Sequence, residues 1–338
     1  MAESLQKVKT LTFYEGKKVL VTGGSGLVGS HLIETLLKEG AEVRTVIHSR
    51  PLQLKAEGIE VLKGDLTRME DCIRAVENVE YVLHLAGVVG GVGMNSAHPA
   101  LMYTPNILMN THMLEAARQA NVDRYLFTSS ACIYPANVSY FEEARGWDAP
   151  PERTNASYGW VKRMGEFQAQ AYVEEYGMKI AIVRPTNAYG PHDNFDLETS
   201  HVIPALIRKA VERQDPFVIW ASGEASRDFI YARDIARGMA MALERYPVPD
   251  PINLATGRSI KIKDLAYLIL KISGYENARV IFDRTKPLGQ LERTVSIAKA
   301  KEKIGFVAKI GLEEGLNETI EWYRSISSRY KDRSEYHY

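Results

Sequence analysis

Tyr158 and Lys162 have a spacing that suits proton transfer. Residues four apart on a helix are neighbours on one face. There a lysine ammonium lowers the pKa of the tyrosine hydroxyl and can hold ribose hydroxyls, while Ser130 could fix the substrate oxygen that the tyrosine protonates or deprotonates. The spacing alone arises by chance in exposed helices, but here it follows strand-like segments headed by a glycine-rich turn. We therefore predict a proton relay of these three residues.

The glycine-rich turn lies between a predicted strand and a predicted helix. Lys17–Val21 is β-branched and apolar, and His31–Lys38 carries leucines at helical spacing. In a dinucleotide-binding turn Gly23 permits the tight turn, Gly26 admits the pyrophosphate, and Gly29 lets the helix pack on the strand. This context favours a dinucleotide site over an ordinary glycine-rich turn. The predicted contacts are Gly23, Ser25, Gly26, Leu27, Val28 and Gly29.

Strand-like and helix-like segments alternate up to Pro185. Strands are expected at Lys17–Val21, Glu42–His48, Ile59–Gly64, Tyr81–Ala86, Arg124–Ser129 and Lys179–Arg184. Helices are expected at Met69–Val79, Pro99–Ala120 and Tyr158–Tyr176. With right-handed crossovers, this order predicts an α/β fold, a Rossmann-type doubly wound parallel sheet.

The alternation breaks after Pro185 into loops rich in Gly, Pro and Asp. Helices are expected there at Val202–Glu212, Asp234–Arg245 and Ile262–Ser273. We predict a dinucleotide-binding domain over residues 1–185 and a smaller C-terminal α/β substrate-binding region over 186–338. The two domains are not separated at a single point in the chain. Pro251–Leu254 resembles a strand that could return to the sheet, so a stretch near 228–256 is expected to belong to the first domain.

The end of the second strand indicates which dinucleotide binds. An NAD-binding protein usually presents an acid to the ribose there, but this chain has Ile47-His48-Ser49-Arg50. Arg50 could pair with a 2′-phosphate, which favours NADP, with NAD as the alternative, or it could be a solvated loop arginine. Asp65, after the third strand, could bind adenine or cap the next helix. The predicted cofactor contacts also include Leu66, Leu85, Ala86, Gly87, Tyr158, Lys162 and Pro185.

The composition is that of an ordinary globular protein. The 42 basic residues balance the 42 acidic ones, so no global field favours nucleic acid or an anionic membrane. The two cysteines, Cys72 and Cys132, argue against a disulfide framework. Met1–Gly16 lacks the apolar centre of a signal peptide, and no apolar run reaches membrane-spanning length. We expect a cytoplasmic protein that binds neither nucleic acid nor a membrane, and no metal site.

The motifs resemble the extended short-chain dehydrogenase/reductase family, the NAD-dependent epimerase/dehydratases. The resemblance covers nearly the whole chain. It is carried by Thr22–Gly29, Ser129-Ser130, Tyr158–Lys162 and Arg184–Pro191. A narrower resemblance to the GDP-L-fucose synthases lies in Val89–Gly91, Ala131–Pro135, Pro185–Phe195 and Ser200–Pro204.

This narrower resemblance implies epimerisation at C3 and C5 of a GDP-linked 4-keto-6-deoxy-mannose, then NADPH-dependent reduction at C4. Cys132 and His201 would be the base and acid, and Tyr158 would act with the nicotinamide. The alternative interpretations give neither residue a catalytic role: Cys132 would be a small buried residue, and His201 would cap a helix. If the chain stays extended after Ser130, Cys132 lies on the same side.

Two other functions remain open at this point. One is a redox-neutral epimerase such as GDP-mannose 3,5-epimerase with tightly bound NAD(P), which shares the run Cys132–Pro135 but typically has lysine at the position of His201. The other is a scaffold that senses dinucleotide without turnover, which the intact Ser130, Tyr158 and Lys162 argue against.

The substrate and the assembly follow from the same resemblance. A nucleotide diphosphate needs cations on an otherwise neutral protein. Trp220 either stacks on the base or sugar or belongs to the core. A homodimer is implied through the helices Pro99–Ala120 and Tyr158–Tyr176. The predicted substrate contacts are Ser130, Asn187, His201, Val202, Lys209, Trp220, Arg227 and Arg293.

Overall fold

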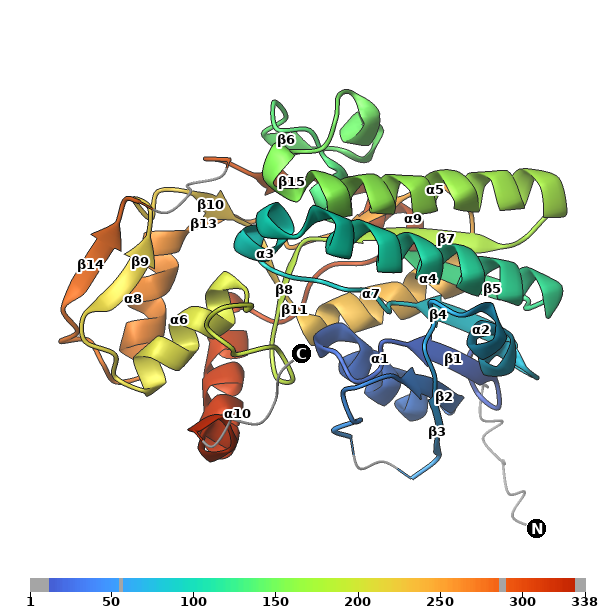
Figure 1. Ribbon diagram of the computed structural model, residues 1–338, viewed down its shortest axis with the longest axis horizontal. Helices are drawn as coiled ribbons and strands as arrows, with labels where there is room; N and C mark the ends of the chain where they lie inside the picture. Colours follow the sequence, from blue (N-terminus) through green and yellow to red (C-terminus); the bar gives the residue numbers. More distant parts are fainter. Residues whose placement is uncertain (1–11, 55–56, 286–289, 332–338) are drawn as a thin grey trace, which may run out of the picture.

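The computed structural model describes residues 12–54, 57–285 and 290–331, so the start of the segment used for the signal-peptide prediction lies outside the described residues. Its centre is a seven-stranded sheet, paired in parallel throughout (Figure 1). The strands are β1 (Lys18–Thr22), β2 (Glu42–Ile47), β3 (Ile59–Lys63), β4 (Tyr81–His84), β5 (Arg124–Thr128), β7 (Ile180–Pro185) and β12 (Ile252–Leu254).

The order of the strands locates a ligand site. They follow one another as β12-β7-β5-β4-β1-β2-β3, so the chain goes from β1 to one side of the sheet and later returns to the other side at β4. In doubly wound sheets ligands bind beyond the carboxyl ends of the strands where the order reverses. The carboxyl ends of β1 and β4 therefore mark the expected position of a dinucleotide.

Helices cover both faces of the sheet (Figure 1). Helices α1 (Leu27–Lys38) and α7 (Ala232–Arg245) pack on one face, and α2 (Met69–Val76), α4 (Pro99–Gln119) and α5 (Ala156–Tyr176) pack on the other. Successive residues of a strand point to opposite faces, and a strand covered on both faces is apolar throughout. This arrangement explains the continuous apolar runs that predicted the strands.

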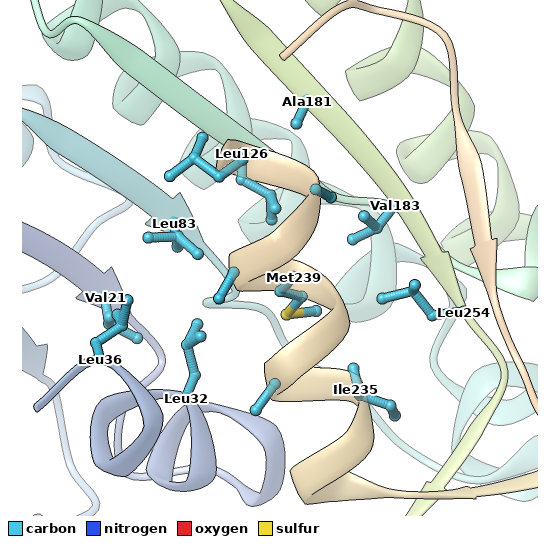
Figure 2. Close-up of a cluster of buried hydrophobic side chains, with 14 of the residues drawn as sticks. Val21, Leu32, Leu36, Leu83, Leu126, Ala181, Val183, Ile235, Met239 and Leu254 are labelled. Atoms are coloured by element: carbon cyan, nitrogen blue, oxygen red, sulfur yellow. The ribbon is translucent and has the colours of Figure 1, made fainter. Parts of the chain in front are cut away.

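Each face has its own buried cluster. Figure 2 shows the first, where Leu32 of α1 and Met239 of α7 meet Val21, Leu83 and Leu126 of the strands. All five side chains are fully buried. Each such side chain stabilises the fold by roughly 1.5–3 kcal/mol. Because these side chains anchor β1, β4 and β5, the carboxyl ends of those strands have a fixed position.

A second region lies beside the sheet, built from the chain after β7 (Figure 1). Its core combines helices with short two-stranded sheets, in which β9 pairs with β14, β8 with β11 and β10 with β13. Its helices are α6 (Val202–Val211), α8 (Ile262–Ile272) and α10 (Leu312–Lys331). Its strands are β8 (Asn187–Tyr189), β9 (Phe217–Trp220), β10 (Ser226–Arg227), β11 (Phe229–Tyr231), β13 (Ile260–Lys261) and β14 (Val280–Asp283).

A small cluster joins the two regions. Strand β6 (Tyr140–Phe141) pairs in parallel with β15 (Thr294–Val295), which comes from the far end of the chain. Phe141 and Val295 are buried there with Ile133. The remaining elements are α3 (Val92–Ala97), α9 (Ala298–Ile304) and the 3-10 helices η1 (Ala131–Ile133), η2 (Glu143–Trp147) and η3 (Arg153–Asn155).

The predicted fold class is confirmed. The six strands expected before Pro185 are present, and Ile252–Leu254 returns to the sheet beside β7 as expected. The boundary between the two domains stays a prediction. The short strands that the sequence did not indicate have two to four residues, too few for a period to be recognised. Within the described residues, no helix is both long and apolar enough to cross a membrane.

Candidate active site

The glycine-rich turn joins β1 to α1 without room for side chains. Gly23 has a φ of +72°, and a Cβ there would lie 3.0 Å from the backbone nitrogen of Ala86. A Cβ on Gly29 would lie 2.2 Å from the carbonyl oxygen of Gly23. Real Cβ atoms do not come as close to backbone as 2.2 Å, and the positive φ of Gly23 strains any other residue in an already tight space. Both positions therefore need glycine for the turn to form.

The N-terminus of α1 is suited to hold an anion. Its N-cap residue is Gly26, so no side chain caps the helix, and no acidic residue lies in its first turn. The first amide groups of a helix have no acceptor within the helix, and the helix dipole makes this end positive. The pyrophosphate of a dinucleotide fits this cradle, which includes the backbone of Ser25, Leu27 and Val28.

The end of β4 forms the other side of the cradle. The hydroxyl oxygen of Thr22 accepts hydrogen bonds from the backbone nitrogens of Leu85 and Ala86, both at 3.0 Å. The same hydroxyl lies 2.9 Å from Nδ1 of His84. Burial lowers the pKa of His84 to about 3, which keeps the ring neutral. Leu85 and Ala86 therefore lie directly beside the glycine turn, with Gly87 next in the chain.

Arg50 joins the two regions of the molecule. Its Nη2 donates to the carbonyl oxygen of His192 at 3.1 Å. His192 has a φ of +72°, which is uncommon for a residue other than glycine and is found at functional sites. Arg50 is half-buried and is therefore not the freely solvated arginine that we considered as an alternative.

Asp65 closes a short turn that precedes α2. Its Oδ1 accepts hydrogen bonds from the backbone nitrogen of Thr67 at 2.9 Å and from the Thr67 hydroxyl at 2.7 Å. These bonds lower the pKa of the Asp65 carboxyl. The adjacent Leu66 is buried, and its carbonyl accepts from the thiol of Cys72 at 3.3 Å. The N-cap residue of α2 is Arg68, and no side chain caps this helix, so the capping alternative is wrong; adenine recognition stays a prediction.

The chain does not stay extended after Ser130. The 3-10 helix η1 begins at once, and Oγ of Ser130 accepts from the backbone nitrogen of Cys132 at 3.1 Å. Our argument from an extended strand is therefore wrong, because a helical turn follows. That turn nevertheless brings the two side chains to the lining of one cavity.

Lys162 and Tyr158 lie together on α5. Nζ of Lys162 is 5.3 Å from the centre of the Tyr158 ring and donates to the carbonyl oxygen of Thr128 at 2.7 Å. Burial lowers the pKa of Lys162 to about 8, opposed by the charges of Cys132 and Glu166. Burial raises the pKa of Tyr158, and Cys132 raises it further. Our expectation of a lowered tyrosine pKa is wrong for this structure, because burial removes water from around the phenol and so raises its pKa.

One cavity gathers residues from distant parts of the chain. It brings together five of the residues that we predicted for the site, which are Ser130, Cys132, Pro185, Asn187 and Arg293. Asn187 is held in place by a hydrogen bond from its Nδ2 to the carbonyl oxygen of Asp228, at 2.7 Å. The complete lining is Ser130, Ala131, Cys132, Phe141, Pro185, Thr186, Asn187, Asp228, Arg293 and Val295.

Two arginines form a positive site at this cavity, which Arg293 lines. Burial, together with the charge of Arg293, lowers the pKa of Arg227 to about 10. Both donate to Gln290, Arg227 to its carbonyl oxygen and Arg293 to its Oε1, each at 2.8 Å. Nη2 of Arg293 also lies 3.6 Å from Oε2 of Glu152. Two guanidinium groups and one carboxylate leave a net positive charge, which suits a diphosphate.

Lys209 of α6 contacts β9, and Trp220 is the last residue of β9. Nζ of Lys209 donates to the carbonyl oxygen of Val218 at 3.0 Å, and burial lowers the pKa of this lysine. Trp220 is 47% exposed, so it is not the core residue that we considered as an alternative. Contacts of either side chain with a substrate stay predictions.

His201 lies outside the cavity lining described above. It is exposed at the N-cap of α6, immediately before Val202, and its side chain makes no capping hydrogen bond. The capping alternative therefore fails. Burial raises the pKa of the Asp193 carboxyl to about 6, and the nearby His201 opposes this rise. The role of His201 as an acid stays a prediction.

Sequence reasoning missed several residues of the site. Thr186 lies inside a stretch that we had matched to the synthases, so that match could have indicated it. Asp228 is buried and accepts from the backbone nitrogens of Thr256 and Gly257, at 3.0 and 2.7 Å. Phe141 belongs to a two-residue strand. Asp228 and Phe141 belong to no recognisable motif.

Known proteins resemble this chain over most of its length. Residues 19–255 match the NAD dependent epimerase/dehydratase family. The GDP-L-fucose synthase of Sinorhizobium fredii is 34% identical, over 92% of this chain and 96% of that protein. UDP-glucose 4-epimerase of Thermotoga maritima with UDP-glucose has a TM-score of 0.82 at 27% identity, over 92% of this chain and 99% of that one. A GDP-L-fucose synthetase of Naegleria fowleri bound to NADP has a TM-score of 0.79 at 27% identity, over 94% of this chain and 97% of that one.

Proposed function

This chain belongs to the NAD dependent epimerase/dehydratase family, and we propose that it converts GDP-4-keto-6-deoxy-mannose to GDP-L-fucose. The reaction combines epimerisation at C3 and C5 with NADPH-dependent reduction at C4. The relatives named as GDP-L-fucose synthases support the substrate. Since a fold alone does not determine function, the proposal depends on the residues of the site.

The observation that carries the proposal is the position of Cys132. Its thiol lines the same cavity as Ser130 and Asn187. It also lies close enough to Tyr158 and Lys162 for its charge to affect the pKa of each. A group able to remove a proton from carbon therefore stands beside the groups suited to reduce a ketone. A simple ketoreductase would need only the second set.

The epimerisation uses acid–base chemistry at the carbons next to the ketone. Cys132, as the thiolate, takes the proton from C3, and the electron pair moves to the C4 oxygen as an enolate. His201 returns a proton to the opposite face of C3, a role that an imidazole can perform as a general acid. The same exchange inverts C5 after the sugar ring pivots. One proton leaves and one returns at each carbon, so this half consumes no reductant.

The reduction uses Ser130, Tyr158 and Lys162. Bound NADPH supplies the hydride for C4. The hydroxyl of Ser130 holds the C4 oxygen, and Tyr158 gives this oxygen its proton as the carbonyl becomes a hydroxyl. Tyr158 then recovers a proton from solvent. Lys162 holds the ribose of the cofactor and stabilises the tyrosinate that forms.

The cofactor site favours NADP. The glycine turn and the uncapped start of α1 fit a pyrophosphate, and Arg50 at the end of β2 suits a 2′-phosphate. The Naegleria fowleri relative is bound to NADP. NAD is the alternative, because Arg50 already has a protein partner in the carbonyl oxygen of His192.

Arg227 and Arg293 would hold the diphosphate of the substrate. Arg293 lines the cavity and its charge acts on Arg227, so a negative group bound beside both would relieve their repulsion. Asn187 would contact the sugar. Further predicted contacts, which lie outside the cavity lining, are His201, Val202, Lys209 and Trp220.

A homodimer is also part of the proposal. Helices α4 and α5 cover one face of the sheet and expose Leu101, Leu108, Trp160 and Phe167, the last with 60% of its surface exposed. Apolar side chains gathered on one face often mark an interface. Light scattering at micromolar concentration should give twice the mass of the chain, and Phe167→Glu should give the single mass. A monomeric wild type would refute this part.

The test is mass spectrometry of reactions with NADPH and a panel of GDP-, UDP-, CDP- and dTDP-linked 4-keto sugars, beside the unreduced sugars. We expect one NADPH consumed for each GDP-linked product. Isomerised product without NADPH consumption would instead support a redox-neutral epimerase. Preference for another nucleotide would change the substrate but not the reaction type.

A further inference from the structure

A fully buried ion pair lies beneath the candidate site. The side chains of Glu166 and Arg184 are each 1% exposed. Nε of Arg184 donates to Oε1 of Glu166 at 2.8 Å, and Nη2 donates to Oε2 at 2.7 Å. This two-point geometry is the strongest form of such a pair and fixes the relative orientation of both side chains.

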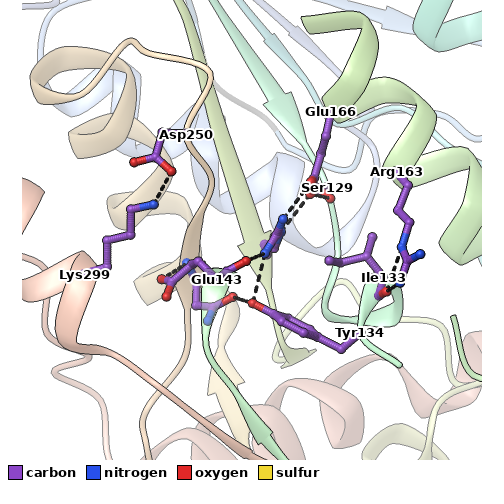
Figure 3. Close-up of polar contacts among 10 residues, drawn as sticks. Ser129, Ile133, Tyr134, Glu143, Arg163, Glu166, Asp250 and Lys299 are labelled. Atoms are coloured by element: carbon purple, nitrogen blue, oxygen red, sulfur yellow. Dashed lines mark hydrogen bonds and ion pairs between the residues drawn. The ribbon is translucent and has the colours of Figure 1, made fainter. Parts of the chain in front are cut away.

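The pair connects the three segments that carry the site. Glu166 lies one helical turn after Lys162 on α5. Its Oε1 also accepts from the hydroxyl of Ser129, the neighbour of Ser130 (Figure 3). Arg184 precedes Pro185 in the cavity wall. One carboxylate therefore holds the helix of the proton relay, the end of β5 and the end of β7.

Further bonds extend the connection to η1. Nη1 of Arg184 donates to the hydroxyl oxygen of Tyr134 at 3.1 Å, and that hydroxyl donates to Oδ1 of Asn253 at 2.7 Å. Arg163 of α5 donates twice to the carbonyl oxygen of Ile133, at 3.1 and 2.7 Å (Figure 3). The segment that contains Cys132 is thus bonded on both sides, by polar groups that all lie within the protein.

Stability alone is a poor reason for this arrangement. Two buried charges lose their hydration, and well-packed apolar side chains of similar volume are often as stable or more stable. The ion pair adds a fixed orientation of the elements that it joins, since apolar contacts do not fix the angle between elements. Catalysis needs such direction, because a misplacement of about 1 Å can cost roughly 100-fold in rate.

We propose that Glu166 and Arg184 are positioning residues, which hold Ser130 and Cys132 in register with Lys162 and with the cavity wall. This inference rests on the proposed function for the roles of Ser130, Cys132 and Lys162. Neither Glu166 nor Arg184 lines the cavity, so they act through the groups that they hold.

Glu166 has a second effect, on the charge of Lys162. The groups that face Lys162 are Tyr158 and Glu166 on its own helix, Cys132 on η1, His84 on β4 and the carbonyl oxygen of Thr128 on β5. His84 is neutral. The negative charge of Glu166 raises the pKa of Lys162 against burial. Without that charge, the pKa of Lys162 falls, and the ammonium is lost at lower pH.

The experiment compares Glu166→Gln and Ser129→Ala with a control, Asp234→Asn. Asp234 is also buried and pairs at 2.8 Å with the partly exposed Arg237, but it lies on α7, on the opposite face of the sheet from α5. Both test variants should lower kcat about 10-fold or more with KM within a few-fold, as expected for misplaced catalytic groups. Glu166→Gln should also move the alkaline limb of the kcat profile by roughly one pH unit toward neutrality. The control should change neither quantity.

A loss of thermal stability with unchanged kcat and an unchanged alkaline limb would overturn the proposal, because the pair would then be structural only. If Glu166→Gln is insoluble, the kcat of Ser129→Ala decides. Hydrogen exchange of residues 130–134 needs no substrate, and Ser129→Ala should accelerate it. If the wild type reduces no nucleotide sugar, the proposed function fails, while exchange at the wild-type rate in Ser129→Ala would count against the positioning role itself.

Discussion

The dinucleotide side and the substrate side of this molecule are assembled in different ways. The glycine turn lies within one short stretch of the chain. Its sequence requires glycine at position 29, because a Cβ there would lie only 2.2 Å from the carbonyl oxygen of Gly23. The cavity instead gathers Cys132, Asn187 and Arg293 from segments far apart in the chain. Close backbone contacts determine the first site, and the packing of the whole chain determines the second. Substitutions should therefore act by steric clash on one side and by lost charge or lost chemistry on the other.

The largest expected effect is that of Tyr158→Phe, which lies where the two sides meet. Removing the phenol oxygen removes the proton for the C4 oxygen, so hydride transfer should fall by about 10²- to 10⁴-fold. Affinity for NADPH should stay nearly unchanged, because the glycine turn is intact. Stopped-flow NADPH oxidation and a fluorescence titration measure the two quantities. A variant within a few-fold of wild type would show that another group donates this proton.

Gly29→Ala tests the dinucleotide side. The added Cβ would collide with backbone, so the turn must open and affinity for NADPH should fall by roughly 100-fold, or about 2.7 kcal/mol. Gly311→Ala is the matched control, because a Cβ there meets nothing within 4 Å. Equal affinities of the two variants would mean that the turn adapts, and the steric account of this side would be lost.

Arg227→Ala tests the substrate side. Charge-assisted hydrogen bonds contribute about 1.5–3 kcal/mol, so KM for the nucleotide sugar should rise by about 10-fold or more, with little change in affinity for NADPH. Arg213→Ala serves as control, since Arg213 has its own backbone acceptor, the carbonyl oxygen of Gly274. Steady-state kinetics at saturating NADPH distinguish the variants. An unchanged KM would remove Arg227 from the diphosphate site.

Arg50→Ala should give the smallest effect and concerns the contact between the two sides. Loss of a partner for the 2′-phosphate should weaken NADPH several-fold while NADH is nearly unaffected. The hydrogen bond to His192 is lost whichever cofactor is used. The ratio of kcat/KM for NADPH to kcat/KM for NADH therefore reports only the contribution of the 2′-phosphate. Equal losses for both cofactors, or a wild type that prefers NADH, would contradict the assignment of NADP.

The sequence indicated the parts of the site that are local. Thr22–Gly29 lies on one turn, and Tyr158 and Lys162 lie on one helix, so periodicity was enough to place them. Phe141 and Val295 could not be found in this way, because their strands have two residues each and pair across the chain. The expected extension after Ser130 failed for a related reason. A strand pattern cannot show where a 3-10 turn begins.

The electrostatics of the site were the least predictable part. The distance between Lys162 and Tyr158 followed from helical spacing, but the pKa of the tyrosine depends on how much water the surrounding segments exclude. Those segments come from β5, η1 and α5 together. Glu166 illustrates the same limit, since its partner Arg184 is on another element and its charge acts on Lys162.

The most direct test of the account is exchange of substrate hydrogens in deuterium oxide, followed by mass spectrometry and NMR. Wild type should incorporate deuterium at C3 and C5. Cys132→Ser should slow this exchange sharply yet still reduce the unepimerised ketone, because Ser130, Tyr158 and Lys162 remain. His201→Gln should impair return of the proton. If both variants exchange at the wild-type rate, Cys132 and His201 are not the epimerisation pair, and the enzyme is a simple 4-ketoreductase.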